Sequence, residues 1–570
     1  MMGKRRKKNQ PPVGEPIVLA IGDVEAILKR ASEGPLSESD VNTLRAALDT
    51  LVILTQELEK KSVSIQRLKQ MLFGASTETT SRVMEKVLEA VRDAKKPRAE
   101  KSGAEGEEGG ACGKKAEGHG RNGAEAYTGA TKTVVRHPSL RAGCRCPGCT
   151  KGKLYANVEP RRLVRLTGQA PVGGTVYELE RFRCNLCGEI FSAQAPEGIG
   201  EEKYDAKSAA IIGLMKYGAG VPFNRLENLQ KNMGIPVPAA TQWEIVSEAA
   251  RTLAPALAEL TRLAAQGEVL HNDDTTAKVL SLGKTGVGEP GDGSATGSAK
   301  NDADPKNEGG RTGVFTSGIV SKAGDREIAL FFTGRKHAGE NLLDVLKLRS
   351  ASLARPIQMC DALAQNMPKE LETILSNCLA HGRRKFVEVA SSFPEACLHV
   401  LGILKDVYRN DAIARNRKMS AEERLRFHQA ESGPRMEDLK AWMSEQIDGR
   451  LVEPNSALGG AIAYMQKYWD RLTLFLRVPG APCDNNVCER ALKKAILHRK
   501  NAYFYRTENG AHVGDLFMSL IHTCELNGAN PFEYLTELQE HAAELRAQPI
   551  AWMPWNYKQA LEAAQARPAG

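Results

Sequence analysis

The chain has 570 residues, of which 42% are hydrophobic, and it carries a formal net charge of +9. This length is enough for about three or four domains of roughly 150 residues each. The net charge is modest, but cations cluster at residues 4–8, 383–385 and 493–500, which favours a polyanionic partner over a merely solvated surface. No apolar run approaches the roughly 18 residues that cross a bilayer, and prolines interrupt the stretch after the basic N-terminus. These features argue against a membrane-spanning or secreted protein and predict a cytoplasmic one.

Residues 1–94 are predicted to form an N-terminal helical region with a heptad pattern. Leucine or isoleucine recurs every seven residues from Leu44 to Leu72, and charged residues fill the surface between. This spacing is typical of a short coiled coil that joins copies of the chain, although one amphipathic helix packed on a globular body would carry the same stripe. Residues 95–130 are rich in Gly, Ala, Lys and Glu, which predicts a flexible linker.

Residues 131–200 contain two Cys-x-x-Cys pairs separated by strand-like segments. The four cysteines are Cys146, Cys149, Cys184 and Cys187. Two such turns predict a four-thiolate zinc ribbon, because tetrahedral Zn²⁺ needs two turns that face each other. The other cysteines are scattered, as expected of buried thiols in a reducing compartment. A redox role for the pairs stays open, and so does Cys144 as a competitor for its neighbour in the first pair.

From residue 266 to residue 496 the pattern changes to strands alternating with helices. Strands are predicted at 267–280, 313–322, 326–334, 355–360 and 376–381, and helices at 337–348, 362–375 and 382–390. Three antiparallel strands followed by helix, strand, helix, strand and helix are the element order of a ribonuclease H-like domain. The chain is therefore predicted to be a multidomain α+β protein in which this catalytic domain is combined with the N-terminal coiled coil and the zinc ribbon.

Three other segments complete the predicted organisation. Residues 201–265 read as a helical connecting region and residues 497–570 as a C-terminal helical segment. Residues 283–310, rich in Gly, Asp and Lys, read as a long loop inserted between the first two strands.

Three acidic residues occupy positions at which such a topology brings side chains together. Asp273 lies on the first strand, Asp361 at the end of the fourth, and Glu489 near the head of a late helix. Carboxylates within about 4 Å of one another repel by several kcal/mol per pair, so they gather around a cation, and oxygen ligands select Mg²⁺ or Mn²⁺. Each acid also has a simpler explanation: Asp273 as a turn cap, Asp361 as a helix N-cap, and Glu489 in a capping box with Asn486.

Six segments carry a further signal. They are LKQMLFGASTE, HNDDTTAKVL, MCDALAQNM, NCLAHGRRKF, CDNNVCERALKKAILHRKNAYF and SLIHTCELNGANPFEYL. In this order they resemble motifs of the DDE transposases of the insertion sequence sixty-six family, and the similarity covers nearly the whole chain. The resemblance implies that Asp273, Asp361 and Glu489 bind two catalytic Mg²⁺ or Mn²⁺ ions, with Asp274 as the alternate for the first acid. It also implies a helical insertion at about residues 390–475.

The chain departs from the family pattern at two places near the acids. Ala362 and Leu363 stand where Gly-Tyr is common, and Lys493 and Lys494 stand where Arg-Pro is usual. Both departures leave the acids intact, so they bear on substrate geometry more than on catalysis.

The resemblance implies a transposase that hydrolyses the 3′ ends of its element with metal-activated water and joins the freed 3′ hydroxyls to target DNA. Its implied partners are DNA, which the N-terminal, zinc-ribbon and connecting regions would recognise, further copies of the chain through the coiled coil, and accessory proteins encoded by the same element. Its implied location is the bacterial cytoplasm, at the nucleoid. Cations and a histidine near the acids are expected to contact DNA phosphates. They are His381, Arg383, Arg384, Lys385, Arg490, Arg499 and Lys500.

Two alternatives remain from the sequence. One is a zinc-ribbon DNA-binding protein without catalytic activity that acts as an accessory or regulator. The other is a nuclease of the same fold that cuts DNA without joining it.

Overall fold

The computed structural model describes residues 202–282, 313–367 and 373–565, together with short segments between residues 27 and 45 and between residues 141 and 196. The chain divides into two compact units, one formed by residues 1–96 with 174–570 and the other by residues 97–173. The predicted coiled coil beyond residue 45, the linker and the inserted loop lie outside the described residues. So do three of the four paired cysteines, Cys146, Cys184 and Cys187.

The described parts of the cysteine-containing region are short. In the unit of residues 97–173, the Gly152 N–H donates a hydrogen bond to the Cys149 sulfur at 3.4 Å. In the other unit, strand β1 (Arg181–Arg183) pairs antiparallel with β2 (Ile190–Ser192), and the second cysteine pair falls between them in sequence. The zinc ribbon stays a prediction.

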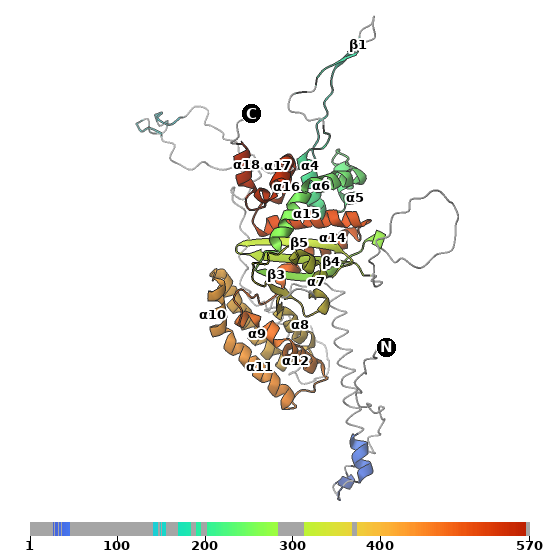
Figure 1. Cartoon of the computed structure of the whole chain (residues 1–570), viewed down its shortest axis with the longest axis vertical. Helices are drawn as coiled ribbons and strands as arrows, with labels where there is room; N and C mark the ends of the chain where they lie inside the picture. The colour runs from blue at the N-terminus through green and yellow to red at the C-terminus, as the bar shows by residue number, and fades with distance from the viewer. Residues whose placement is uncertain are drawn as a thin grey trace, which may run out of the picture. The chain divides into compact units, whose positions relative to one another are not determined.

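The larger unit is built on a five-stranded mixed sheet in the order β5-β4-β3-β6-β7. Figure 1 labels β5, β4 and β3 of this sheet. Strand β3 pairs antiparallel with β4 and parallel with β6, while β4 pairs antiparallel with β5 and β6 parallel with β7. The strands are β3 (Val269–Thr276), β4 (Phe315–Ala323), β5 (Arg326–Gly334), β6 (Ile357–Cys360) and β7 (Ile374–Asn377). The four strands predicted before residue 361 are confirmed to within a few residues.

The chain after β6 differs from its prediction. The sequence predicts a helix over 362–375, but the described residues there form a 3₁₀ turn, Ala364–Asn366, and the start of β7. The strand predicted at 376–381 is also wrong in its bounds, because β7 starts two residues earlier and α8 (Leu379–Val389) already contains the last three residues. Pro368 disfavours a helix here, and two buried side-chain amides bind the last carbonyl of the 3₁₀ turn in place of helical partners.

Helices lie on both sides of the sheet in Figure 1, and α14 (Asn486–Ala502) packs across β3 and β4. Between β5 and β6 the predicted helix is confirmed as α7 (Ala338–Leu346). Helices also occupy the segment for which a helical insertion was predicted. It comprises α9 (Pro394–Asn416), α10 (Ala421–Glu431), α11 (Gly433–Asp448), α12 (Ala457–Lys467), α13 (Trp469–Leu472) and the 3₁₀ turn Leu474–Leu476. Its buried side chains form one core with Val269 and Ile357 of the sheet.

The other helices come from the segments before β3 and after α14 and lie above the sheet in Figure 1. They are α4 (Ala206–Gly213), α5 (Phe223–Asn232), α6 (Ala239–Ala264), α15 (Glu508–Leu526), α16 (Pro531–Glu540), α17 (Ala542–Ala547) and α18 (Tyr557–Gln565). Shorter turns are the π turn Leu214–Gly218 and the 3₁₀ turns Leu280–Leu282 and Pro549–Trp552.

Helix α15 covers the outer edge of β5 with a stripe of polar side chains spaced four residues apart. Four residues of helix rise about 6 Å, close to the roughly 6.7 Å between alternate strand residues, so each side chain meets one outward backbone N–H. The pairs are Thr333 N–H with Asp515 (2.6 Å), Phe331 with Ser519 (3.0 Å), Ala329 with Thr523 (3.1 Å) and Glu327 with Asn527 (3.3 Å). The stripe satisfies edge donors that would otherwise be open to another strand.

Candidate active site

Adjacent residues at the end of β3 have different surroundings. The Asp274 carboxylate accepts a hydrogen bond from the Ser317 hydroxyl at 2.7 Å and lies 2.9 Å from Nδ1 of His337, the residue that precedes α7. Side chains alternate across a strand, so Asp273 points to the opposite face. Asp274 therefore joins β3 to β4 and α7, which favours Asp273 over Asp274 as the functional acid.

One side-chain amide connects the first two predicted acids. The Asn366 Nδ2 donates to Asp361 at 2.6 Å and reaches Asp273 at 3.4 Å. Asp361 also accepts from the Leu363 backbone N–H at 3.1 Å, in a turn that does not begin an α-helix, so its explanation as a helix N-cap is wrong. The ends of β3 and β6 thus bring the two carboxylates together, as the parallel pairing of these strands requires.

Two fully buried amides hold Asn366 in place. The Asn366 carbonyl accepts from Asn272 at 2.7 Å and from Gln358 at 2.8 Å, and the two amides bond each other at 2.9 Å. Their strands, β3 and β6, are the ones that carry the acids. Sequence reasoning assigned these three residues no role, although Asn272 and Asn366 lie within two of the motif segments.

The start of α14 is fixed to the sheet by Asn485. Its side-chain oxygen lies 3.1 Å from His271 Nδ1, and its amide donates to the Asn272 carbonyl at 3.1 Å. Burial lowers the pKa of His271 to about 4, so the ring is neutral and Nδ1–H donates to Asn485. The Asn485 backbone N–H donates to the Cys378 sulfur at 3.2 Å. Glu489, one turn later, is therefore carried on a helix start tied to both β3 and α8.

A glycine allows α14 to come close to the sheet beside Asp273. Gly318 of β4 stands opposite Asp273 in the strand register. A Cβ at this position would meet Leu492 of α14 at 3.0 Å and the Cys488 sulfur at 3.4 Å. A larger residue here would push the helix that carries Glu489 away from the two aspartates.

The capping-box explanation of Glu489 is wrong. The residue that precedes the helix, Asn485, makes no side-chain cap, and the Asp484 carboxylate instead accepts from Asn486 through its backbone (3.1 Å) and side chain (2.6 Å). The Glu489 Oε1 atom is buried and has no hydrogen-bond partner within the described parts of the chain. His381 Nε2 lies 3.9 Å from it.

Burial and negative charge dominate the electrostatics around Asp273. Burial raises the pKa of Asp273 to about 7, and the nearby charges of Asp361, Glu489 and Asp274 act in the same direction. Burial lowers the pKa of His381 despite the opposing charge of Glu489, so this ring is a poor counter-charge. The site has the oxygen donors that Mg²⁺ and Mn²⁺ prefer.

A second set of ligand atoms next to this site suits a metal less well. Atoms of Cys378, His381 and Glu489 lie within 4.8 Å of one another. Burial raises the pKa of Cys378 to about 12, and its sulfur already accepts the backbone N–H of Asn485. A thiolate ligand needs a lowered pKa, so the raised pKa of Cys378 argues against metal binding by this set.

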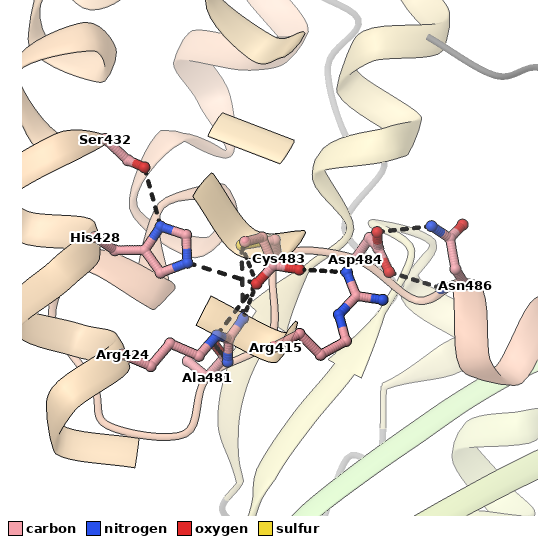
Figure 2. Close-up of polar contacts among 9 residues, drawn as sticks. Arg415, Arg424, His428, Ser432, Ala481, Cys483, Asp484 and Asn486 are labelled. Atoms are coloured by element: carbon pink, nitrogen blue, oxygen red, sulfur yellow. Dashed lines mark hydrogen bonds and ion pairs between the residues drawn. The ribbon is translucent and has the colours of Figure 1, made fainter. Parts of the chain in front are cut away.

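A buried ion-pair cluster contacts the loop that leads to α14 (Figure 2). Asp411 of α9 accepts from Arg424 of α10 at 2.7 Å and from Arg415 at 2.8 Å, and His428 Nε2 lies 3.5 Å away. The Cys483 thiol completes the group, 3.8 Å from Asp411. The Arg424 guanidinium supplies the cation between these groups, so the cluster is a packed ion-pair network and not a metal site.

The predicted phosphate-contacting residues occupy different environments. Lys385, Arg490 and Lys500 are exposed. Arg383 is only 8% exposed, and its guanidinium lies 5.8 Å from the Tyr408 ring. Arg499 donates to the Thr275 hydroxyl at 3.2 Å and also bonds Thr276, just beyond Asp273 on β3. The role of all seven residues in DNA contact stays a prediction.

Comparison with known proteins assigns the chain to a class. The family model "Transposase IS66 family" matches residues 203–290 and 305–513, a span that includes the sheet, the insertion and all three acids. The chain therefore belongs to the Transposase IS66 family. Among the described helices, none combines the length and the apolar character needed to cross a membrane.

Curated relatives come from Sinorhizobium fredii and are named only as uncharacterized proteins. The protein y4jD is 34% identical over 32% of this chain and 36% of its own length, and y4qI is 28% identical over 33% and 35%. The protein y4hP is 25% identical over 75% of this chain and 76% of its own length. The chain thus spans about a third of y4jD and y4qI and about three quarters of y4hP.

Proposed function

We propose that this chain is a metal-dependent DDE transposase that cleaves DNA at the ends of its element and joins the ends to target DNA. The proposal rests on the family and on one observation above all. Asp273 and Asp361 share the Asn366 amide, and Glu489 is close enough to raise the pKa of Asp273. Two aspartates joined by one amide, with the charge of a third acid acting on one of them, are the electrostatic basis on which we propose a divalent metal here.

The order β5-β4-β3-β6-β7, with three antiparallel strands followed by two parallel ones, supports a ribonuclease H-like catalytic domain. In it, Asp273 and Asp361 would hold metal from adjacent strand ends, and Glu489 would add the third acid from α14. Asn366 would fix the spacing of the two aspartates. Two Mg²⁺ or Mn²⁺ ions, when bound, activate a water or a 3′ hydroxyl and stabilise the leaving oxygen of a phosphodiester.

The remaining parts of the proposal concern DNA and assembly. The exposed cations Lys385, Arg490 and Lys500 would hold the phosphate backbone in register without reading bases. Structural Zn²⁺ on the two cysteine pairs is supported by the N–H···S hydrogen bond to Cys149, a type of contact that steadies metal-bound sulfur. Assembly through the heptad segment, accessory proteins of the same element and a place at the bacterial nucleoid belong to the same proposal.

The test is the substitution Glu489→Gln, which keeps the size of the side chain and removes its charge. The substrate is a plasmid that carries the DNA flanking the gene, with Mg²⁺ in the reaction. We expect nicking and joining to fall by about three orders of magnitude or more, because a metal ligand is lost. Binding to the same DNA in Ca²⁺, measured by mobility shift, should stay within about twofold because no phosphate contact is removed.

The matched control is Glu508→Gln, which places the same change in the first turn of the next helix, α15. This variant should cut as the unmodified chain does. Cleavage by Glu489→Gln at the control rate would refute the role of Glu489. Binding with no nicking by the unmodified chain, at any concentration of Mg²⁺ or Mn²⁺, would favour the accessory DNA-binding alternative.

A further inference from the structure

The chain just after α14 makes a strained turn. Tyr503 has φ 66° and ψ −41°, and the Phe504 N–H donates to the Ala502 carbonyl at 2.8 Å. These values describe a γ-turn with positive φ, a rare conformation that costs a non-glycine residue on the order of 1–3 kcal/mol. Such strain persists only where the surrounding structure fixes it, so the contacts of this turn are informative.

The turn is fixed to the segment that continues β3. The Tyr505 N–H donates to the Lys278 carbonyl at 2.8 Å, and the Leu280 N–H donates to the Tyr505 carbonyl at 2.9 Å. Lys278 lies five residues beyond Asp273, or about 16 Å at the usual rise of a strand. The turn is therefore held at a defined place, a few nucleotides' length from the acids.

This fixed turn presents two aromatic rings to solvent. Tyr503 is 69% exposed and Phe504 is 43% exposed, whereas the next ring, Tyr505, packs inside against His498 with ring centroids 4.4 Å apart. Leu497, one turn before the helix end, is 40% exposed as well. A strained backbone that holds two aromatic rings in water does not stabilise the folded chain. A ligand that covers the rings would explain why they are exposed.

The charge around the rings defines the chemistry of that ligand. No acidic residue occurs in sequence between Glu489 and Glu508, nor between Asp274 and Leu282. Exposed cations stand on both segments. They are Lys278, Lys493, Lys500 and Arg506. Aromatic faces among cations are the pattern of proteins that bind single-stranded nucleic acid, in which bases stack on rings while cations follow the backbone.

We propose that Tyr503 and Phe504 form a stacking platform for an unpaired base of the DNA strand, a few nucleotides from the acids. The base must be unpaired because a base inside a duplex has its faces covered by its neighbours. The proposal rests on the proposed function only in that DNA is the polymer. It requires neither metal nor cleavage, so it is tested separately.

The experiment uses the full chain without added Mg²⁺ or Mn²⁺ and two fluorescent probes, a 20-nucleotide oligothymidylate and a 20-base-pair duplex, at one fixed salt concentration. The variant is Tyr503→Gly, which removes the ring and relieves the positive φ, so its melting temperature should not fall. We expect the dissociation constant for the single strand to rise about tenfold and that for the duplex to change less than twofold. Tyr503→Trp keeps a ring and should bind the single strand as the unmodified chain does.

Two control variants distinguish the effect of the rings on DNA binding from the effect of a nearby positive charge and from that of any exposed apolar side chain. Lys500→Gln should weaken both probes and lower the salt dependence, because it removes a phosphate contact. Leu353→Ser changes an apolar residue in the loop before β6 that is 44% exposed, close to the exposure of Phe504. It should alter the binding of neither probe. The salt dependence of Tyr503→Gly should equal that of the unmodified chain.

Three outcomes would overturn the platform. One is unchanged single-strand affinity in Tyr503→Gly, and another is an equal loss for both probes. The third is a change in molar mass by light scattering, which would assign the rings to contact between protein chains. Failure of Glu489→Gln to stop cleavage, with a tenfold single-strand defect in Tyr503→Gly, would leave the platform standing and refute only the assignment of Glu489.

Discussion

Two buried aspartates of this chain, Asp411 and Asp273, stand in opposite electrostatic environments. Burial opposes ionisation of Asp411, but a hydrogen bond from His428 and the charges of Arg424 and Arg415 hold its pKa well below the usual range (Figure 2). Burial raises the pKa of Asp273 to about 7, with further acids beside it in place of cations. Cations of the chain pair with the first aspartate, whereas the charges that raise the pKa of the second come from other acids.

The contrast separates an acid whose charge the chain neutralises from an acid whose charge it does not neutralise. An acid cluster that the chain neutralises by itself contributes to folding, here by joining α9 and α10 to the loop before α14. An acid cluster that the chain leaves unneutralised costs stability, and folding alone gives no reason to keep it. Neutralising one carboxylate should therefore lower the unfolding free energy in the first cluster and raise it in the second.

The largest expected effect on stability is the loss caused by Asp411→Asn. The change leaves Arg424 largely buried beside a neutral partner, which costs about 3 kcal/mol of unfolding free energy. Urea denaturation in EDTA at pH 7 measures it. The control, Asp406→Asn, neutralises an aspartate on the same helix that forms a longer pair with Arg409 (3.5 Å) nearer the surface, and it should cost less than about 0.5 kcal/mol.

An additional substitution sharpens this prediction. If the loss comes from an unpaired guanidinium, then Arg424→Met in the Asp411→Asn background should restore part of the stability. An additive second loss would mean that Asp411 acts by packing and not by charge. The comparison with Asp273 would then lose its electrostatic basis.

Asp273→Asn should act in the opposite direction in the absence of metal. The folded-state pKa of about 7 lies above the unfolded value, so the folded chain binds more protons between about pH 4 and pH 7, and stability falls as the pH rises through this window. The variant removes this loss and should be more stable than the unmodified chain by at least about 1 kcal/mol at pH 8 in EDTA, with little difference at pH 4.

The difference between variant and unmodified chain isolates Asp273, because Asp515, whose pKa burial also raises to about 7, contributes equally to both. Mg²⁺ should raise the melting temperature of the unmodified chain and not that of Asp273→Asn. A variant that is less stable at pH 8 in EDTA, or that responds to Mg²⁺ as the unmodified chain does, would contradict the view that the cluster lacks a cation.

The sequence predicted the parts of this fold that local patterns determine. Strand-like segments identified the strands before residue 361, and the ends of β3 and β6 do bring Asp273 and Asp361 to one amide. The role of the three acids stays a prediction. The helix predicted over 362–375 failed because a local pattern does not reveal that Asn272 and Gln358 bind the Asn366 carbonyl across the sheet.

The partners that hold the site could not be predicted for the same reason. Asn366 meets Asp273 from 93 residues away, and Asn485 meets Asn272 from 213 residues away. Their motifs could be recognised in the sequence, but the sequence does not indicate which distant residue each polar side chain contacts. The Asp411 cluster was missed because its members are spread over two helices of the insertion and the loop before α14.

The smallest predicted effect concerns a third environment, the uncharged part of the polar stripe on α15. Thr523→Val keeps the shape of the side chain but leaves the Ala329 N–H of the β5 edge without its acceptor, which costs about 1 kcal/mol. Urea denaturation measures the loss, and hydrogen exchange of the Ala329 amide should become faster. Thr536→Val is the control, because that buried hydroxyl donates within its own helix, to Phe532, and its loss should cost less than about 0.5 kcal/mol.

A loss at Thr523 as large as that of Asp411→Asn would mean that burial of any unpaired polar group, charged or neutral, destabilises this fold equally. In that case the opposite environments of Asp411 and Asp273 would no longer distinguish a structural acid from a functional one.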